Sequence, residues 1–344
     1  MKQPFRIGVS PDYYTEARES LDAVVSATLA GVEGIVVESM GDLPGLVATP
    51  ESLNRFDAIF ALAVHIKADS LAGVDRPAIV ARWGVGYDRI DVEALTAHDV
   101  ALSITPNSVR RPVAEAIFTL ILALAKNLPE QDRVARQGGW RGNLSRLGVS
   151  IQGTTLGSVG CGNIGQEMFR MSQSMGFGRR IAYDPFVSQD QVRDLGVELV
   201  DIDTVFRESD FVTVNTLLNK NTEGLVTERH LRLMKPSAFF VNTARGPIVQ
   251  HDALVRALRE NWIAGAGIDV FPVEPPPKDD PLFSLGNCIV APHAMAWTAR
   301  LMLDNGTEAA NNVLAVSRGE LPGGIVNRDV VDRPGFRAKL ERFR

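Results

Sequence analysis

Three charged residues, Arg245, Glu274 and His293, each follow a short apolar run that predicts a buried strand. An imidazole can exchange a proton near neutral pH, and a neighbouring carboxylate favours its protonated form. A guanidinium can bind a carboxylate through two parallel hydrogen bonds. Each residue alone is more often a solvated surface group. Because parallel strands end at one edge of a sheet, the set predicts an acid–base site that binds an anion.

A glycine-rich stretch precedes these residues, with the pattern Gly-x-Gly-x-x-Gly between a predicted strand and a helix over about residues 166–175. Gly160 allows a tight turn, Gly162 lets the backbone approach a pyrophosphate, and Gly165 lets the helix pack close to the strand. The N–H groups at the helix start can bind phosphate. The pattern predicts a dinucleotide site, with an empty structural turn as the alternative. A dinucleotide beside the acid–base site predicts hydride transfer to or from a nicotinamide.

Asp184 ends the next predicted strand, about 20 residues beyond the glycine pattern, where an acid typically binds a ribose 2′-hydroxyl group. A carboxylate at this position repels a 2′-phosphate, and residues 185–186 offer no cation to bind one. The sequence therefore favours NAD over NADP. Arg179 and Arg180, just before the strand, keep NADP open as an alternative.

Residues 82–91 form a second glycine-containing turn, placed after a predicted strand in the first part of the chain. Ligands bind at the carboxyl ends of strands in open α/β sheets. Gly84 and Gly86 leave backbone N–H groups accessible to an anion. A plain strand-to-helix turn is the alternative interpretation.

The composition excludes several classes of partner. The chain has 344 residues and a net charge of −5, which argues against nucleic acid and anionic membranes. The longest apolar run, residues 116–125, is half a membrane span in length and predicts a buried helix. Two scattered cysteines, Cys161 and Cys288, suggest no disulfide, and the N-terminus lacks the apolar core of a signal peptide. We expect a cytoplasmic protein with a small-molecule substrate and no metal.

Short β-branched runs alternate with helical patterns along nearly the whole chain, which predicts an α/β fold with parallel sheets. The first sheet unit ends near residue 108, before a long helix expected over 113–127. The tail from residue 328 is polar and basic, and we expect it to be loosely ordered. The predicted strands comprise residues 7–9, 35–37, 58–62, 78–81, 101–105, 154–159, 180–183, 197–200, 210–215, 238–243, 264–271 and 288–292.

Taken together, these motifs resemble those of the D-isomer-specific 2-hydroxyacid dehydrogenases, whose members include glyoxylate and hydroxypyruvate reductases and phosphoglycerate dehydrogenase. The resemblance extends from Gly84 to about Asn327. The sequences that carry it are Gly-Val-Gly-Tyr-Asp at 84–88, Gly-Cys-Gly-Asn-Ile-Gly at 160–165, Tyr-Asp-Pro at 183–185, Asn-Thr-Ala-Arg-Gly at 242–246, Asp-Val-Phe-Pro-Val-Glu-Pro at 269–275 and Pro-His at 292–293.

The resemblance implies a role for each matching residue. His293 would be the acid–base group, Glu274 its partner and Arg245 the substrate anchor. Asp269 would contact the nicotinamide carboxamide, and Val85 and Gly86 would hold the substrate carboxylate through backbone N–H groups. Further contacts to the cofactor would come from Gly160, Gly162, Asn163, Ile164, Gly165, Asp184, Thr243 and Ala244.

The resemblance also implies a homodimer in which a Rossmann NAD-binding domain is inserted into a flavodoxin-like substrate-binding domain. The substrate-binding domain would comprise residues 1–108 and a return segment, 299–330. The NAD-binding domain would span 109–298, and 331–344 would be a terminal extension. The chain departs from the family in Arg82 and Trp83, in a loop over 215–218 that lacks the usual proline, and in residues 294–298, which include Trp297.

We hypothesise that Arg82 adds a cation to the site and selects a substrate with a second anionic or strongly polar group. The alternative is that Arg82 pairs with an acid such as Asp88 and never meets the substrate. The leading function is NAD-dependent interconversion of a 2-hydroxy acid and a 2-keto acid. Glu274 beside His293 argues against the formate-oxidising branch. Two alternative functions are that of an NAD-sensing corepressor and that of a dehydrogenase of another oxyanion, such as phosphite.

Overall fold

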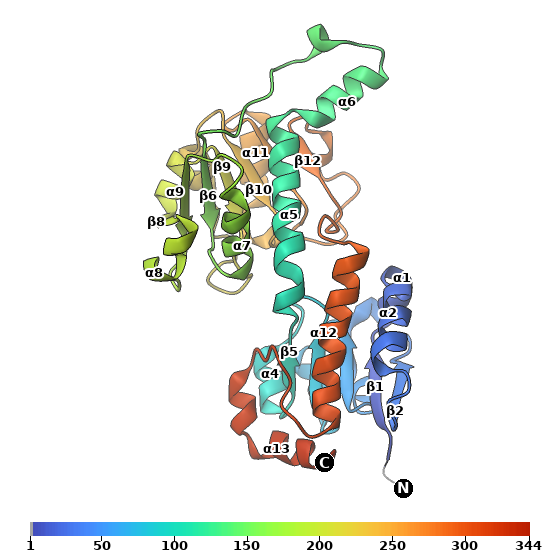
Figure 1. Ribbon diagram of the computed structural model, residues 1–344. Coiled ribbons are helices and arrows are strands. Elements are labelled where there is room, and N and C mark those ends of the chain that lie inside the picture. Colours follow the sequence, from blue (N-terminus) through green and yellow to red (C-terminus); the bar gives the residue numbers. More distant parts are fainter. Residues whose placement is uncertain (1–2) are drawn as a thin grey trace. The chain divides into compact units, whose positions relative to one another are not determined.

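The computed structural model describes residues 3–344, which form two compact units, each built on one parallel β-sheet (Figure 1). Unit 1 runs to Val109 and resumes at Trp297, whereas unit 2 comprises Arg110–Ala296. The chain passes from unit 1 into unit 2 within α5 (Pro106–Ala125). Two doubly wound parallel sheets confirm the predicted fold class.

Unit 1 has five strands in the order β2-β1-β3-β4-β5, the flavodoxin-like order. Adjacent strand residues face opposite sides, so Phe60 packs into the cluster that includes α2 and α12, and Ile59 packs against α3 and α4. The elements are β1 (Phe5–Val9), β2 (Ile35–Ser39), β3 (Ala58–Ala61), β4 (Ile79–Arg82), β5 (Ala101–Ser103), α1 (Tyr13–Glu16), α2 (Arg18–Val24), α3 (Pro50–Leu53), α4 (Val92–Ala97), α12 (Ala299–Ser317) and α13 (Pro334–Glu341).

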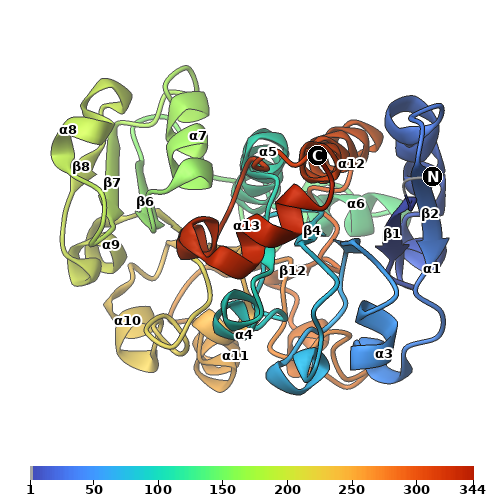
Figure 2. The same ribbon diagram turned by 90° about the horizontal axis from the view of Figure 1, so that it is seen from below.

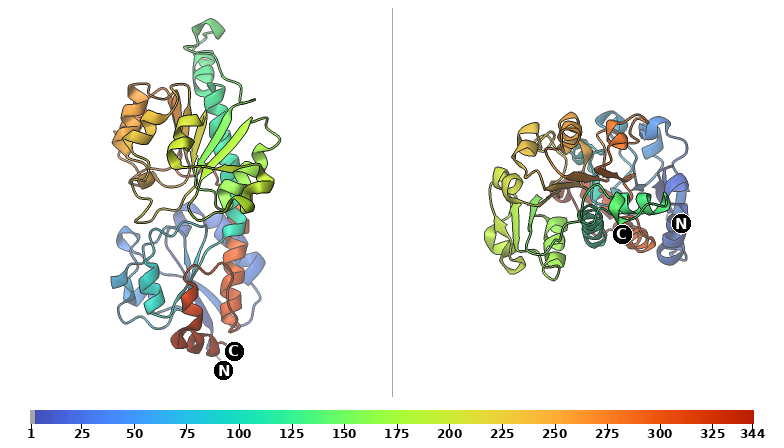
Figure 3. Two further views of the ribbon diagram at one scale, coloured as in Figure 1. Left: turned by 90° about the vertical axis from the view of Figure 1, so that its left-hand side faces the viewer. Right: turned by 90° about the horizontal axis from the view of Figure 1, so that it is seen from above.

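Unit 2 has seven strands in the order β12-β11-β10-β9-β6-β7-β8, and the chain changes direction across the sheet at β6. Helices lie on both sides of this sheet (Figure 3). Phe239 packs with α5 and α7, and Phe240 packs with α9, α10 and α11. The elements are β6 (Thr155–Val159), β7 (Arg179–Tyr183), β8 (Glu198–Leu199), β9 (Phe211–Val214), β10 (Phe239–Asn242), β11 (Gly265–Ile268), β12 (Cys288–Val290), α6 (Leu128–Arg136), α7 (Asn163–Ser172), α8 (Gln189–Val192), α9 (Ile202–Glu208), α10 (Glu228–Leu233) and α11 (His251–Arg259).

The long helix α5 begins earlier than the expected position near residue 113. It starts at Pro106 and contains Pro112. A carboxylate oxygen of Glu308 accepts the Ser108 N–H at 3.3 Å, which satisfies a donor in the first turn. Pro112 has no backbone N–H, so the helix has one hydrogen bond fewer at this position. Burial of the neighbouring apolar residues offsets this loss.

The expectation that the tail from residue 328 is loosely ordered is wrong. Phe336 of α13 is fully buried in the core of unit 1. Lys339 donates to the carbonyl oxygens of Pro77 at 2.9 Å and His98 at 2.8 Å, which anchors α13 beside α4 (Figure 2). Although the tail is polar and basic overall, it has apolar residues at helical spacing that pack in or against this core, namely Phe336, Leu340 and Phe343.

Candidate functional site

The glycine-rich loop joins β6 directly to α7. Gly160 has a φ of +98°, and a Cβ there would lie 2.5 Å from the carbonyl oxygen of Asn215. A Cβ on Gly165 would lie 2.8 Å from the Gly160 carbonyl oxygen. A Cβ on Gly162, by contrast, would meet no atom within 4 Å, so a ligand can approach the backbone there. The first N–H groups of α7 have no acceptor within the helix and can bind phosphate.

Asp184 follows β7 and contacts this loop. Its Oδ2 atom accepts a hydrogen bond from the Cys161 N–H at 2.8 Å, and its Oδ1 atom accepts one from the Phe186 N–H at 2.9 Å. The carboxylate is therefore held in place, with lone pairs left for hydroxyl groups. Burial, with a contribution from the Asp184 charge, raises the pKa of the Cys161 thiol to about 12, so this thiol stays protonated.

The loop after β10 carries Arg245 and is ordered by Asn242. The Asn242 side-chain amide donates to the Arg245 carbonyl oxygen at 2.9 Å and accepts from the Ala244 N–H at 3.0 Å. In the same loop, the buried hydroxyl of Thr243 has no hydrogen-bond partner among residues 3–344. Because an unsatisfied buried hydroxyl is costly, its position fits a ligand that supplies the hydrogen bond.

The structure brings Glu274 and His293 together. The Nδ1 atom of His293 lies 3.0 Å from Oε1 and 2.9 Å from Oε2 of Glu274. Burial opposes ionisation of Glu274, but the hydrogen bond from His293 and the charges of His293 and Arg245 outweigh it. The pKa of Glu274 is thereby held below its ordinary value of 4.5. The carboxylate is ionised at neutral pH, and its bond to Nδ1 leaves Nε2 of His293 to meet a ligand.

Asp269, directly after β11, holds the segment that follows His293. Its carboxylate accepts hydrogen bonds from the Ala294 N–H at 3.1 Å and the Met295 N–H at 3.3 Å. Burial raises the pKa of Asp269 above its ordinary value, although the charge of His293 acts in the opposite direction. These contacts join the end of β11 to the segment after β12, where His293 has a φ of +54°. This conformation is uncommon for a residue other than glycine.

Two residues that position this site, Asn242 and Gly246, are not predicted as site residues from the sequence. A Cβ on Gly246 would lie 2.0 Å from the carbonyl carbon of Phe271. Only glycine therefore allows the loop that carries Arg245 to contact the loop that leads to Glu274. The sole signal for both residues is their place in the Asn-Thr-Ala-Arg-Gly run at 242–246.

The remaining predicted site residues, Arg82, Val85 and Gly86, lie in unit 1, at and just after the end of β4. The N–H groups of Val85 and Gly86 have no acceptor within the described chain. The Arg82 side chain lies against its own loop, with Nε donating to the Gly86 carbonyl oxygen at 2.9 Å. The turn thus offers two backbone donors to an anion.

Gly162, Asp184 and Thr243 together fit a nicotinamide dinucleotide, because they combine an open backbone, a fixed carboxylate and an unsatisfied hydroxyl. Over residues 3–344, no group of three or more His, Cys, Asp or Glu side chains could hold a metal ion. No single helix in that part of the chain is long and apolar enough to cross a membrane. Taken together, the bent pair of helices α5 and α6 is long and apolar enough, by length and composition alone.

Comparisons with known proteins identify the family of the chain. Residues 118–295 match the family described as D-isomer specific 2-hydroxyacid dehydrogenase, NAD binding domain. The glyoxylate reductases of Korarchaeum cryptofilum and Thermococcus onnurineus are 39% identical over 293 residues and 40% identical over 296 residues. Each alignment covers 83% of this chain and 88% of the relative. The crystal structure of a glyoxylate reductase from Paecilomyes thermophila is 25% identical, with a TM-score of 0.81, and the match covers 95% of this chain and 100% of that one.

The likenesses confirm the predicted family and the predicted class of reaction. The enzyme is an oxidoreductase that transfers hydride between a nicotinamide dinucleotide and a 2-hydroxy acid/2-keto acid pair. The two parallel sheets and the site at the strand ends of unit 2 are consistent with this chemistry. The chain belongs to the D-isomer-specific 2-hydroxyacid dehydrogenases.

Proposed function

We propose that the enzyme uses NADH to reduce a small 2-keto acid of the glyoxylate or hydroxypyruvate type. The observation that carries this proposal is the hydrogen bond between His293 and Glu274, at the same sheet edge as the glycine-rich loop. The relatives named glyoxylate reductase favour a small substrate.

Three side chains divide the catalytic work in this proposal. His293 donates a proton from Nε2 to the carbonyl oxygen of the substrate, and ionised Glu274 stabilises the protonated imidazole through Nδ1. Arg245 binds the substrate and draws electron density toward that oxygen. When bound, the nicotinamide supplies the hydride that adds to the carbonyl carbon.

Binding is assigned to backbone donors and to the strand ends of unit 2. Val85 and Gly86 donate their N–H groups to the substrate carboxylate, supported by their lack of another acceptor within residues 3–344. Asp269 contacts the nicotinamide carboxamide, and the Thr243 hydroxyl gains a partner from the cofactor. The residues proposed to hold the dinucleotide are Gly160, Gly162, Asn163, Ile164, Gly165, Asp184, Thr243, Ala244 and Asp269.

A preference for NAD over NADP is proposed from the charges around Asp184. Its carboxylate repels a 2′-phosphate. The two nearby cations are occupied elsewhere: Arg179 pairs with Glu198 at 2.8 Å, and Arg180 donates to the Ser172 hydroxyl at 2.8 Å. Both arginines lie at the start of β7, about 10–13 Å along the strand from its end.

A homodimer is proposed from the projecting segment, defined as residues 128–147, which extends from the rest of unit 2 (Figures 1 and 3). It exposes Leu128 at 56%, Trp140 at 75% and Leu147 at 85% of their surfaces. Large apolar side chains exposed on one projecting segment favour association with a second copy of the chain. A cytoplasmic location is also proposed, since Cys161 and Cys288 are both free thiols.

The test follows the near-ultraviolet absorbance of NADH or NADPH with a panel of 2-keto acids, including glyoxylate, hydroxypyruvate, pyruvate and a branched acid. We expect turnover with NADH, fastest with the small acids, and a loss of about 10²–10⁴-fold in His293→Ala. Tight NADH binding without turnover of any panel member would contradict the proposed substrate class. Full activity in His293→Ala would contradict the proposed proton donor.

A further inference from the structure

Arg82 closes the turn that follows β4. Its Nε atom donates to the Gly86 carbonyl oxygen at 2.9 Å, and its Nη1 atom donates to the Trp83 carbonyl oxygen. One guanidinium therefore holds carbonyl groups on both sides of Gly84. A Cβ on Gly84 would lie 3.0 Å from Arg82 Nη1, and the φ of Gly84 is +125°, so a glycine is required where the guanidinium packs.

A second set of hydrogen bonds holds the middle of the same turn. The Gly84 N–H donates to the Thr105 hydroxyl at 2.8 Å, and the Gly84 carbonyl oxygen accepts from the Thr105 N–H at 3.1 Å. The Thr105 hydroxyl in turn donates to Oδ1 of Asn305 on α12 at 2.7 Å. Thr105 and Asn305 are both buried, so this connection is shielded from water.

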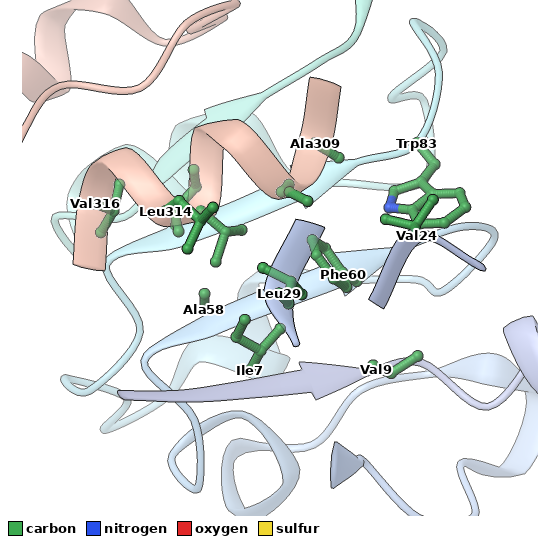
Figure 4. Close-up of a cluster of buried hydrophobic side chains, with 14 of the residues drawn as sticks. Ile7, Val9, Val24, Leu29, Ala58, Phe60, Trp83, Ala309, Leu314 and Val316 are labelled. Atoms are coloured by element: carbon green, nitrogen blue, oxygen red, sulfur yellow. The ribbon is translucent and has the colours of Figure 1, made fainter. Parts of the chain in front are cut away.

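Trp83 adds a packed anchor to the turn. Its indole lies in the core of unit 1 beside Val24 (Figure 4) and meets the Tyr13 ring edge-on, with 4.8 Å between the ring centroids. A Cβ on Gly306 of α12 would lie 2.5 Å from the indole, so the helix has a glycine where the ring packs. The turn is thereby held from the core side as well.

The three carbonyl groups of Trp83, Gly84 and Gly86 are thus all engaged by the protein. The N–H groups of Val85 and Gly86 have no acceptor within the described chain. Adjacent N–H groups of this kind form an anion site, and the guanidinium of Arg82, bound to the Trp83 and Gly86 carbonyl oxygens of the same turn, strengthens the positive potential there.

We propose that Arg82 is a positioning residue for substrate binding: it fixes the turn so that the Val85 and Gly86 N–H groups bind the carboxylate shared by all 2-keto acids. Its guanidinium acts through the loop and leaves selection among substrates to other residues. The inference rests on the proposed function of Val85 and Gly86, and it differs from direct binding of a second anionic group by Arg82.

Arg82→Ala and Arg82→Lys test this inference, with Arg18→Ala as the control. Arg18 is an exposed cation of unit 1 that pairs with Asp22 on the surface. In Arg82→Ala we expect KM to rise by about tenfold for glyoxylate, pyruvate and 2-oxoglutarate alike. All three share the carboxylate whose charge-assisted hydrogen bonds to the Val85 and Gly86 N–H groups would be weakened. We expect a smaller change in kcat, and NADH affinity within about twofold of the wild type. Arg82→Lys keeps the charge but not the contact with two carbonyl groups, so its KM should lie between the values of the wild type and of Arg82→Ala.

Hydrogen exchange of the 83–90 backbone, measured without substrate on the same three variants and the wild type, gives a readout independent of turnover. Faster exchange in Arg82→Ala, but not in Arg18→Ala, supports the inference. An increase in KM confined to 2-oxoglutarate would overturn it, because Arg82 would then meet the second carboxylate itself. Unchanged KM and unchanged exchange would also overturn it. A wild-type enzyme that reduces none of the acids would count against the proposed function, while exchange would still decide the role of Arg82.

Discussion

The Nδ1 atom of His293 lies 2.9 Å from Oε2 of Glu274, although the two residues belong to loops after different strands. The pKa of Glu274 is held below its ordinary value of 4.5 despite burial. The carboxylate therefore carries its charge across the neutral range, where it favours the protonated imidazole that keto-acid reduction requires.

Glu274→Gln should reduce kcat for reduction by at least about tenfold across the neutral range. The amide still accepts a hydrogen bond but no longer stabilises a protonated His293. A pH profile of reduction with saturating NADH measures this. Glu223→Gln, at an exposed position of unit 2, is the control and should leave the profile unchanged. An unchanged kcat in Glu274→Gln would contradict the role assigned to the pair.

The same lowered pKa has a consequence for stability. A carboxylate whose pKa is lower in the folded state stabilises the fold above its unfolded pKa, and this contribution is lost as the pH falls through the folded value. Between about pH 5 and the lowered pKa of Glu274, the wild type should lose more unfolding free energy than Glu274→Gln. Urea titrations at several pH values measure the difference. Parallel pH dependence in the two proteins would argue against the shift.

Gly246→Ala should impair catalysis without unfolding unit 2. The added Cβ would lie 2.0 Å from the carbonyl carbon of Phe271, so the Arg245 loop must shift away from the loop that leads to Glu274. We expect kcat/KM to fall by about 10²-fold, the scale of a 1 Å misplacement. Gly286→Ala, where a Cβ meets no atom within 4 Å, is the matched control. Equal activity in the two variants would show that the close approach is dispensable.

Asp184→Ala should narrow the preference for NADH over NADPH. Removing the carboxylate deletes its hydrogen bonds to the ribose and its repulsion of a 2′-phosphate. We expect kcat/KM for NADH to fall by about tenfold and that for NADPH to fall less or rise. Asp190→Ala removes an exposed carboxylate from the same unit and serves as the control. A uniform loss with both cofactors would contradict a discriminating role.

Leu147→Asp should weaken the proposed dimer. The substitution places a charge on the projecting segment at a side chain that is 85% exposed, so the isolated chain should remain folded. Sedimentation velocity over a range of concentrations would show more monomer than in the wild type. Leu321→Asp, at a leucine of unit 1 that is 54% exposed, is the control. A wild-type protein that is monomeric at all concentrations would contradict the dimer.

Phe336→Ala should destabilise unit 1 by about 3–5 kcal/mol, because it empties a fully buried site beneath α13. Arg337→Ala, on the exposed side of the same helix, should cost less than about 1 kcal/mol. Equilibrium unfolding in urea measures both. A loss below about 1 kcal/mol in Phe336→Ala would indicate that α13 is only loosely attached.

Much of the site can be predicted from the sequence because its geometry is encoded locally. The spacing of Gly160, Gly162 and Gly165 specifies a turn between strand and helix, and Asp184 follows the next strand. Parallel strands then bring residues after β10, β11 and β12 to one edge, which is why distant positions such as Glu274 and His293 can be paired in advance. The fold class, predicted from the alternating pattern, and the family and class of reaction, predicted from the motifs and their resemblance to the family, are confirmed.

Other features were decided only by tertiary packing. The contact between Gly246 and Phe271 depends on two loops that meet in space, and the direction of the Arg82 guanidinium depends on which carbonyl groups its own turn presents. The sequence predicts a loosely ordered tail because its few apolar residues are outnumbered by charges. Its order depends on packing of Phe336 in the core of unit 1 and on the hydrogen bonds of Lys339 to the Pro77 and His98 carbonyl oxygens. Local spacing thus encodes the chemistry, whereas contacts distant in sequence decide its geometry.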